Sequence, residues 1–337
     1  MLKKNIKDLT LEELEKIVAV LGEPAYRAKQ IFSWLYQKGA ASFEQMSTIS
    51  QTLRNKLEKK YVIGTVELSA QLRSSDGTEK FLFKLADGTF IESVLIFAQE
   101  RKTVCLSTQV GCKFACSFCA SGRRGFVRNL LPGEITNQIL FLQHKLKHKI
   151  TNYVFMGMGE PLDNFNNLSK AIMIMDAKEG MNIGSRRITV STCGIIPGIE
   201  KLKKLNPQIN LSVSLHAADD QLRDTLVPIN RRYRLKELIS SCANFAGKLT
   251  LEYVLIKDKN DALQQADQLA KIAKRLGAKV NLIPLSRVTG LDLEPTPGEE
   301  TGIFLKRLLK QGVQATLRES KGRDISAACG QLAGKLK

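Results

Sequence analysis

Residues 105–119 read CLSTQVGCKFACSFC and hold four of the seven cysteines in a chain of 337 residues. Cys112, Cys116 and Cys119 have the spacing C-x3-C-x2-C, and Cys105 lies seven residues upstream of the first of them. Three thiolates can hold three irons of a four-iron cluster and leave the fourth iron without a protein ligand. An open position of this kind can bind and activate a small molecule, as it does on a catalytic zinc. The stretch therefore predicts a catalytic 4Fe–4S site.

Two other metal sites also use clustered cysteines. A structural zinc has four ligands, usually Cys or His at recognisable spacing, but His144, His148 and His216 do not follow the motif closely. A ferredoxin-type cluster usually has four cysteines. The spacing favours a cluster with an open iron. An odd number of cysteines, three of them close together, also does not fit a disulfide framework and indicates metal or redox chemistry in a reducing compartment.

The charge balance is the second strong signal. The chain has 51 Lys and Arg against 33 Asp and Glu, a formal net charge of +18. Folding does not need such an excess, which suggests a polyanionic partner, most simply nucleic acid, although a general basic bias would give the same number. The first residues lack the apolar region of a signal peptide, and no apolar run is long enough to cross a bilayer. We therefore expect a cytoplasmic protein with no membrane partner.

The chain divides by the period of its apolar residues. Residues 1–65 have helical spacing, with Thr10 as a predicted N-cap, and predict a small helical accessory domain. It is either an ordinary amphipathic bundle or, because basic residues lie among its aromatic residues, an RNA-contacting module. Residues 66–102 become strand-like and predict a hairpin extension that turns at Ala86–Thr89 and carries Glu92 inside an apolar run.

From residue 103 to residue 312, strand-like runs alternate with helical patterns. The predicted strands are Val104–Thr108, Tyr153–Met156, Arg187–Ser191, Asn210–Leu215, Leu251–Leu255 and Lys279–Ile283. Predicted helices between them include Gly133–Lys147, Leu235–Phe245 and Ala262–Leu276. This alternation predicts an α/β fold with a parallel sheet, and six units are enough for an open or partial (β/α)6 barrel. Residues 313–337 form a predicted C-terminal segment that carries Cys329.

Polar side chains follow the predicted strands, where the analogy with closed barrels places functional loops. Residues 156–161 (MGMGEP) follow the second strand, and their glycines let the backbone approach a ligand while Glu160 could hold an amino group. Ser191 follows the third strand and Ser214–His216 the fourth, where they could bind a ribose or a carboxylate. Cys193 and Cys242 are interpreted as buried and inert. Cys329 is either a buried tail cysteine or a mobile nucleophile that reaches this rim.

The motif together with the following Gly-Glu loop is the signature of the radical S-adenosyl-L-methionine (radical SAM) superfamily. Within it the chain resembles the RlmN/Cfr family, which methylates adenosine in large-subunit rRNA and, in its RlmN branch, also in tRNA. The resemblance covers nearly the whole chain, and residues 22–30 and 87–96 favour the RlmN branch. The stretches that carry it are GEPAYRAKQ (22–30), STQVGC (107–112), FMGMGEP (155–161) and DISAACGQL (324–332).

The resemblance implies a role for each matching residue. Cys329 would carry the methyl group as S-methylcysteine, Cys105 would be its resolving disulfide partner, and Glu92 would be the general base. The implied cluster ligands are Cys112, Cys116 and Cys119. The implied contacts with S-adenosyl-L-methionine are Gly159, Glu160, Ser191, Ser214, Leu215, His216 and Ser286. Ser286 stands where the family usually has asparagine; serine can still hydrogen-bond but reaches less far.

The implied activity is radical methylation of adenine C2 in the peptidyl-transferase region of 23S rRNA and in tRNA next to the anticodon. It would use two S-adenosyl-L-methionine per turnover, an electron donor such as flavodoxin or ferredoxin, and a disulfide reductant, and the protein would act as a monomer. The alternatives are Cfr-type C8 methylation and a non-catalytic cluster protein that binds RNA, which would have no use for Cys329. The expected RNA-backbone contacts are Arg123, Arg124, Arg128 and residues 231–234.

Overall fold

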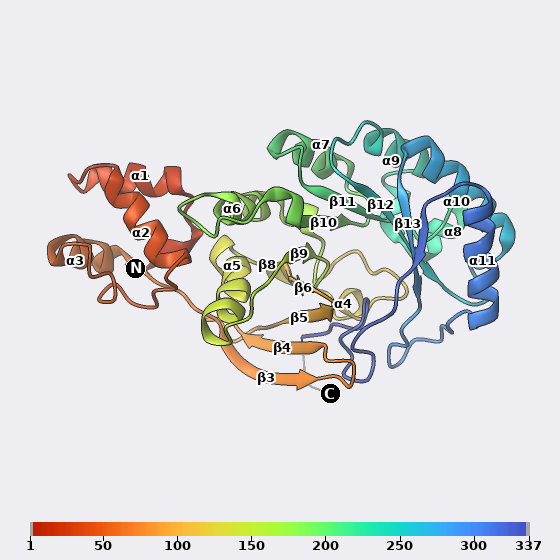
Figure 1. The fold of residues 1–337 in the computed structure, drawn as a ribbon, viewed down its shortest axis with the longest axis horizontal. Helices are drawn as coiled ribbons and strands as arrows, with labels where there is room; N and C mark the ends of the chain where they lie inside the picture. The colour runs from red at the N-terminus through yellow and green to blue at the C-terminus, as the bar shows by residue number, and fades with distance from the viewer. Residues whose placement is uncertain (1–2, 335–337) are drawn as a thin grey trace.

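A computed structural model describes residues 3–334 and has a small helical module beside a large sheet covered by helices (Figure 1). The module contains a parallel pair of two-residue strands and three helices; these are β1 (Lys4–Asn5), β2 (Tyr61–Val62), α1 (Leu11–Val20), α2 (Tyr26–Tyr36) and α3 (Gln51–Lys60). Thr10 caps α1 as predicted, because its hydroxyl accepts from the Glu13 N–H while the Glu13 carboxylate accepts from the Thr10 N–H. Across residues 3–334, no helix combines the length and the apolar composition of a membrane span.

Ten strands form one sheet in the order β14-β13-β12-β11-β10-β9-β6-β5-β4-β3. The first seven strands of that order are parallel; in chain order they are β6 (Arg101–Cys105), β9 (Asn152–Phe155), β10 (Ile188–Thr192), β11 (Asn210–Ser214), β12 (Leu249–Leu255), β13 (Lys279–Pro284) and β14 (Ala315–Leu317). The predicted α/β fold with alternating units is confirmed. The seventh strand, β14, was not predicted, because three residues are too short to show a period.

Helices connect the parallel strands and pack on the sheet (Figure 1). They are α5 (Pro132–Leu140), α6 (Phe165–Asp176), α7 (Ile196–Leu205), α8 (Asp220–Leu226), α9 (Leu235–Cys242), α10 (Leu263–Leu276) and α11 (Gly298–Lys310). The predicted helix 133–147 runs through α5 and then a π-helical turn, Phe141–Lys145. Apart from α8, whose Leu226 packs in a separate cluster, the apolar sides of these helices share one core with the strands, and the carboxyl ends of the parallel strands lie along one edge.

Three antiparallel strands extend the sheet beyond β6: β3 (Glu67–Arg73), β4 (Glu79–Lys84) and β5 (Phe90–Ala98). The predicted hairpin joins β4 to β5, where the Leu85 N–H donates to the Thr89 carbonyl and Gly88 takes a φ of +81°. The C-terminal segment returns beside this extension (Figure 1). The extension therefore brings the turn between β3 and β4 against the end of the chain.

The N-terminal module docks on α5 and α6. Its apolar core includes Leu140 and Ile174 from those two helices. The Gly133 N–H, in the first turn of α5, donates to the Asp8 carboxylate at 2.9 Å, and the buried Lys7 ammonium donates to Asn137 Oδ1 at 2.9 Å. Apolar burial thus supplies the contact, and polar groups at the start of α5 fix its orientation.

We predict that Asp8→Ala destabilises the protein and Asp8→Asn does not. Burial raises the pKa of the Asp8 carboxyl, the Gly133 N–H opposes that rise, and the net shift is upward. The pH-linked part of its contribution is therefore fully present below the unfolded pKa and is lost as pH rises through the folded pKa, whereas the carboxylate still accepts the hydrogen bond from the Gly133 N–H at pH 7. Asparagine keeps an acceptor for Gly133 without a buried charge, whereas alanine loses about 1 kcal/mol of unfolding free energy at pH 7. Urea denaturation measures both; an asparagine variant as unstable as the alanine variant would contradict this explanation.

Candidate cluster and cofactor site

The three-cysteine loop is held between two short strands, β7 (Gln109–Gly111) and β8 (Phe126–Asn129). Gly111 has a φ of +74°, and a Cβ there would lie 1.8 Å from the Gly125 carbonyl oxygen, so only glycine allows this approach. The Cys112 N–H donates to that same carbonyl at 3.0 Å. Inside the closed loop, Cys112, Cys116 and Cys119 all line one cavity.

Burial controls the state of these thiols. It raises the pKa of Cys112 to about 12 and raises the pKa of Cys116 and Cys119. Metal binding must therefore displace thiol protons, which makes it dependent on pH. Among residues 3–334, no three His, Cys, Asp or Glu side chains converge closely enough for one metal ion. An iron–sulfur cluster spreads its thiolates over separate irons, so its ligands need not converge on one metal ion.

The Gly-Glu loop forms a second wall of the same cavity. Glu160 is buried, and its two carboxylate oxygens accept from the N–H groups of Leu162 at 3.0 Å and Cys193 at 2.7 Å. Its own N–H donates to Oε1 of the buried Gln109 at 2.8 Å. Gly159 has a φ of +95°, and a Cβ there would lie 2.5 Å from Gln109 Cβ. Burial raises the pKa of the Glu160 carboxyl, and the Cys193 and Leu162 N–H groups oppose that rise.

The ends of β10 and β11 supply the next side chains of the cavity. Ser191, Ser214 and His216 line it, and the Ser191 hydroxyl donates to the Phe155 carbonyl at 2.8 Å. Burial lowers the pKa of His216 to about 3, so the ring is neutral at pH 7. Its Nδ1 accepts from the Val254 N–H at 3.0 Å, which leaves the proton on Nε2. Leu215 does not line the cavity: its side chain is in the core, and its carbonyl accepts from Arg223.

Two buried polar atoms that face this cavity have no partner among the described residues. They are Oε2 of Glu252, on β12, and the hydroxyl of Ser286, just after β13. Burial raises the pKa of Glu252, whose Oε1 accepts from Ser212 and Asn281, both at 3.1 Å. Buried polar atoms are rarely unsatisfied, so such atoms indicate a ligand that carries hydrogen-bonding groups. Together with the three thiols, they fit a cluster and a polar cofactor bound in one cavity.

A second cavity, of 420 Å³, adjoins the first and contains Cys105 and Cys329. Cys119, Arg318 and Cys329 line both cavities. Burial raises the pKa of Cys105 to about 12, and a Cys329 thiolate adds to the rise, whereas Arg318 opposes it. Both cysteines are free thiols, Cys105 buried and Cys329 exposed. The structure therefore brings these two predicted residues into one chamber, separate from the three-cysteine loop but in contact with it.

Glu92 lies on the other side of the C-terminal segment. It is 1% exposed and lines a third cavity rather than the chamber that holds Cys105 and Cys329. One carboxylate oxygen pairs with the Lys80 ammonium at 3.0 Å, and the other accepts from the N–H groups of Ala333 and Gly334, both at 2.7 Å. In this conformation the carboxylate is fully engaged, and the end of the tail covers it.

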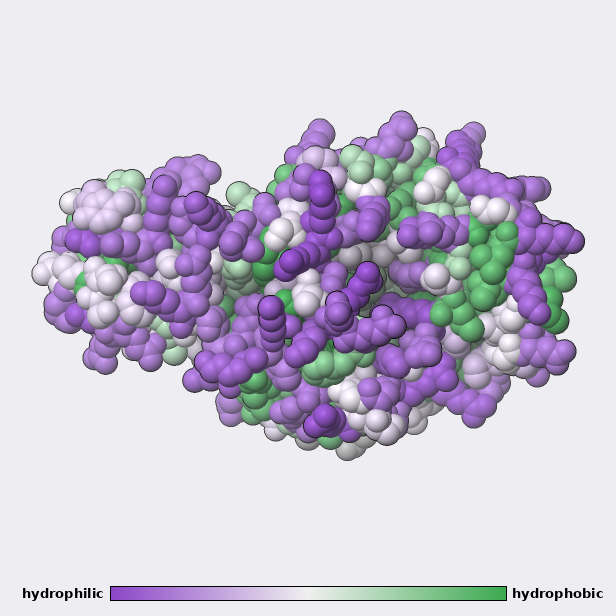
Figure 2. Space-filling view, in the orientation of Figure 1, coloured by the Kyte–Doolittle hydropathy of each residue, from purple (hydrophilic) through white to green (hydrophobic). Residues whose placement is uncertain are grey.

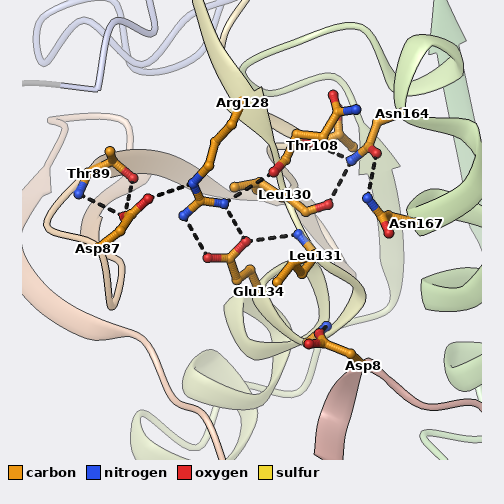
Figure 3. Close-up of polar contacts among 12 residues, drawn as sticks. Asp8, Asp87, Thr89, Thr108, Arg128, Leu130, Leu131, Glu134, Asn164 and Asn167 are labelled. Carbon is orange, nitrogen blue, oxygen red and sulfur yellow. Dashed lines mark hydrogen bonds and ion pairs between the residues drawn. The ribbon is translucent and has the colours of Figure 1, made fainter. Parts of the chain in front are cut away.

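Arg128 is part of the scaffold rather than a free cation (Figure 3). Its guanidinium binds both oxygens of Glu134 at 2.8 Å and Oδ2 of Asp87 at 2.6 Å, and so ties the β4–β5 turn to α5. Beside it, the Asn164 amide donates to the Thr108 and Leu130 carbonyls, which holds β7 and β8 against the loop that carries Glu160 (Figure 3). The guanidinium is thus paired with two carboxylates, and a direct contact between Arg128 and RNA stays a prediction.

The other predicted RNA contacts differ in whether their side chains already bind other residues of the protein. Arg123 and Arg124 donate to carbonyls of Gly290 and Ala333, and Arg234 pairs with Asp224. Arg231 and Arg232 are exposed and make no side-chain hydrogen bond or ion pair within residues 3–334. Figure 2 shows hydrophilic side chains over most of the face seen in Figure 1, including the N-terminal module.

Four residues that support the site were not assigned a role from the sequence. Gln109 orients Glu160, Glu252 and Arg318 line the cofactor cavity, and Arg223 holds the ends of two strands. Arg223 is fully buried and donates to the carbonyls of Cys193, Ser214 and Leu215. Their roles become visible only through the contacts that the folded chain makes.

Comparison with known proteins gives a consistent result. A family model described as the radical SAM superfamily matches residues 106–270, and one described as the ribosomal RNA large subunit methyltransferase N-terminal domain matches residues 4–63. The chain is 45% identical to the dual-specificity RNA methyltransferase RlmN of Pelobacter propionicus, covering 99% of this chain and 97% of that protein. It is 44% identical to the protein of the same name from Geobacter sulfurreducens, covering 98% and 92%. A crystal structure of a radical SAM methyltransferase from Sphaerobacter thermophilus is 42% identical, with a TM-score of 0.92 over 98% of this chain and all of that one.

We predict that Arg223→Met destabilises the rim of the sheet. Methionine fills most of the space but removes the buried donors to the Cys193, Ser214 and Leu215 carbonyls, which costs about 3 kcal/mol of unfolding free energy. Arg234→Met is the matched control, because Arg234 forms an exposed pair with Asp224 whose loss changes the unfolding free energy little. Urea denaturation measures both variants, and equal effects would mean that Arg223 does not hold the rim.

Proposed function

The chain belongs to the RlmN family of radical SAM RNA methyltransferases, and from that premise we propose that it methylates C2 of adenosine in two RNAs. The enzyme uses S-adenosyl-L-methionine and a 4Fe–4S cluster, as its superfamily implies. The proposed substrates are an adenosine in the peptidyl-transferase region of 23S rRNA and the adenosine next to the anticodon of tRNA. The term dual-specificity in the names of the relatives supports two RNA substrates.

One observation carries the proposal: Cys329 lines both the cavity of the three-cysteine loop and the chamber that contains Cys105. A methyl carrier needs this position, because it must meet the methyl donor on one side and the RNA base on the other. We propose Cys112, Cys116 and Cys119 as cluster ligands. The proposed contacts with S-adenosyl-L-methionine are Gly159, Glu160, Ser191, Ser214, His216 and Ser286, with Glu252 as an addition, whereas Leu215 could contribute only its backbone.

The bound cofactors supply a methyl group and the one-electron chemistry that an unreactive adenine carbon requires. Cys329 carries the methyl group as S-methylcysteine and becomes linked to the base. Cys105 then attacks the Cys329 sulfur, which releases the RNA and leaves a Cys105–Cys329 disulfide. Arg318 lies beside both sulfurs, since a Cys329 thiolate, then Glu252 and Cys105, raise the pKa of its guanidinium. Its positive charge opposes the rise in the pKa of Cys105 and so favours the thiolate that attacks the Cys329 sulfur.

Glu92 is the proposed base that removes the proton from the methylated ring. Because Lys80 and the Ala333 and Gly334 amides engage its carboxylate, the end of the tail must leave it before it can act. Two S-adenosyl-L-methionine molecules are used per turnover, one for the methyl group and one for the radical step. An electron donor such as flavodoxin or ferredoxin and a disulfide reductant are the proposed protein partners.

RNA binding is proposed to rest on the excess of 51 basic over 33 acidic side chains, with the exposed Arg231 and Arg232 among the contacts. The target base must leave its stack to enter the chamber. Contacts with phosphates hold the RNA without reading its sequence.

Mass spectrometry of nucleosides tests the function directly. The reconstituted enzyme is incubated with S-adenosyl-L-methionine, a reductant and either 23S rRNA or tRNA, and the RNA is digested. We expect 2-methyladenosine from both RNAs, and none with Cys329→Ala, whose cluster absorbance stays that of the wild type. Formation of 8-methyladenosine would assign the Cfr-type reaction instead. Product at the wild-type rate from Cys329→Ala would refute the carrier role, and no methylated nucleoside from the wild type would leave a cluster protein that only binds RNA.

A further inference from the structure

Residues 322–334 form a loop that carries Cys329, and the two sides of this loop are held by different elements. On the downstream side, the Ser121 hydroxyl donates to the Leu332 carbonyl at 2.6 Å, and Glu92 accepts from the next two N–H groups. The Ala120 N–H also donates to the Gly330 carbonyl at 2.7 Å. Since the proposed base Glu92 is part of this downstream contact, that contact must open during turnover.

The upstream side is fastened to the turn between β3 and β4. The Ser74 hydroxyl donates to Asp324 Oδ1 at 2.6 Å, and the Ser75 N–H donates to Oδ2 of the same carboxylate at 3.0 Å. In the opposite direction, the Gly322 N–H donates to Asp76 Oδ2 at 2.9 Å. The β3–β4 turn and the tail thus each supply one carboxylate to the contact, although Ser74 and Asp324 are 250 residues apart in sequence.

The fit at this contact is close as well as polar. Gly322 has a φ of +69°, and a Cβ there would lie 2.8 Å from Ala327 Cβ and 3.0 Å from Thr78 Cγ2. Ser74 and Thr78 are buried although they belong to a turn. The Asp76 carboxylate also accepts from the Thr78 N–H at 2.8 Å, which fixes the shape of the turn. Hydrogen bonds to the turn hold the pKa of Asp76 at about 2 despite some burial, so the contact stays charged at neutral pH.

None of these residues reaches the chemistry. Ser74, Asp76 and Asp324 line neither the cofactor cavity nor the chamber. Asp76 and Asp324 are exposed, and a turn on the surface of a sheet does not need a partner from the end of the chain in order to fold. The contact fixes the chain at Asp324, five residues before Cys329. This is the upstream side of the loop, which does not include the contact with Glu92.

We propose that the β3–β4 turn is the pivot of the tail, and that Ser74, Asp76 and Asp324 are positioning residues for the methyl transfer. When the downstream side leaves Glu92, the pivot keeps Cys329 within reach of Cys105. Without it, the upstream side would keep only the longer contacts of Ser320 with the Pro284 carbonyl and of Lys80 with the Ser326 carbonyl, both at 3.3 Å, and the effective concentration of one thiol at the other would fall. This inference rests on the proposed roles of Cys329 and Cys105.

The test measures that effective concentration in the reconstituted holoenzyme. Ser74→Ala and Asp324→Ala each remove one side of the contact, and Ser241→Ala is the matched control, because its hydroxyl donates to the Glu200 carboxylate at 2.7 Å on a distant exposed surface. Each protein is equilibrated anaerobically with glutathione and glutathione disulfide, which oxidises the two thiols and is itself reduced. The Cys105–Cys329 peptide is then quantified by mass spectrometry.

We expect Ser74→Ala and Asp324→Ala each to lower the effective concentration of the Cys105 and Cys329 thiols at least about tenfold, as for a tethered pair whose linker lengthens. We expect Ser241→Ala to leave it unchanged. Turnover number falls in the same variants, whereas KM for RNA, cluster absorbance and the unfolding midpoint stay at wild-type values. An effective concentration within about twofold of the wild type in both pivot variants would overturn the pivot. The readout needs no methylation. A failed carrier role for Cys329, seen as activity in Cys329→Ala, is therefore distinguishable from a failed pivot.

Discussion

The return of the chain end to the sheet is the interaction on which the rest of the site depends. Residues 315–317 pair with β13 as a parallel strand, and the Arg318 N–H then donates to the Leu282 carbonyl at 2.8 Å. This pairing carries the tail over the open edge of the sheet, where the loops after the other strands already meet. A cysteine far from the cluster motif in sequence thereby becomes part of the same chamber. Without this pairing, Cys105 would be a buried thiol with no partner.

Burial sets the electrostatics of the chamber, and two arginines balance it. Thiols and carboxyls withdrawn from water favour their neutral forms, as the raised pKa values of Cys105, Glu160 and Glu252 show. Arg223 satisfies the carbonyls that end two strands, whereas Arg318 has no oxygen partner among the described residues and faces Cys105, Cys329 and Glu252. Arg223 is therefore structural, whereas Arg318 remains available to the sulfurs of Cys105 and Cys329.

The sequence predicted what depends on local pattern and missed what depends on distant contacts. The parallel strands could be found from their alternation with helices, and the Cys112–Cys119 loop from its spacing. Strand β14 has three residues and is defined by its pairing with β13, so no period could reveal it. The pairing of Arg128 with Asp87 and Glu134 likewise depends on how the chain folds. Glu92 could be identified as a special carboxylate, but its cover by the Ala333 and Gly334 amides depends on how the tail folds back.

We propose that Cys105 and Cys329 act as a pair distinct from the cluster ligands. Trapping the covalent RNA–protein intermediate tests this proposal. Cys105→Ala holoenzyme is incubated with labelled RNA and S-adenosyl-L-methionine under reducing conditions and then run on a denaturing gel. Cys242→Ala is the control, because this buried cysteine lines neither cavity. We expect an RNA–protein adduct with Cys105→Ala only, located on Cys329 by peptide mass spectrometry. Release of methylated RNA by Cys105→Ala at the wild-type rate, with no adduct, would contradict it.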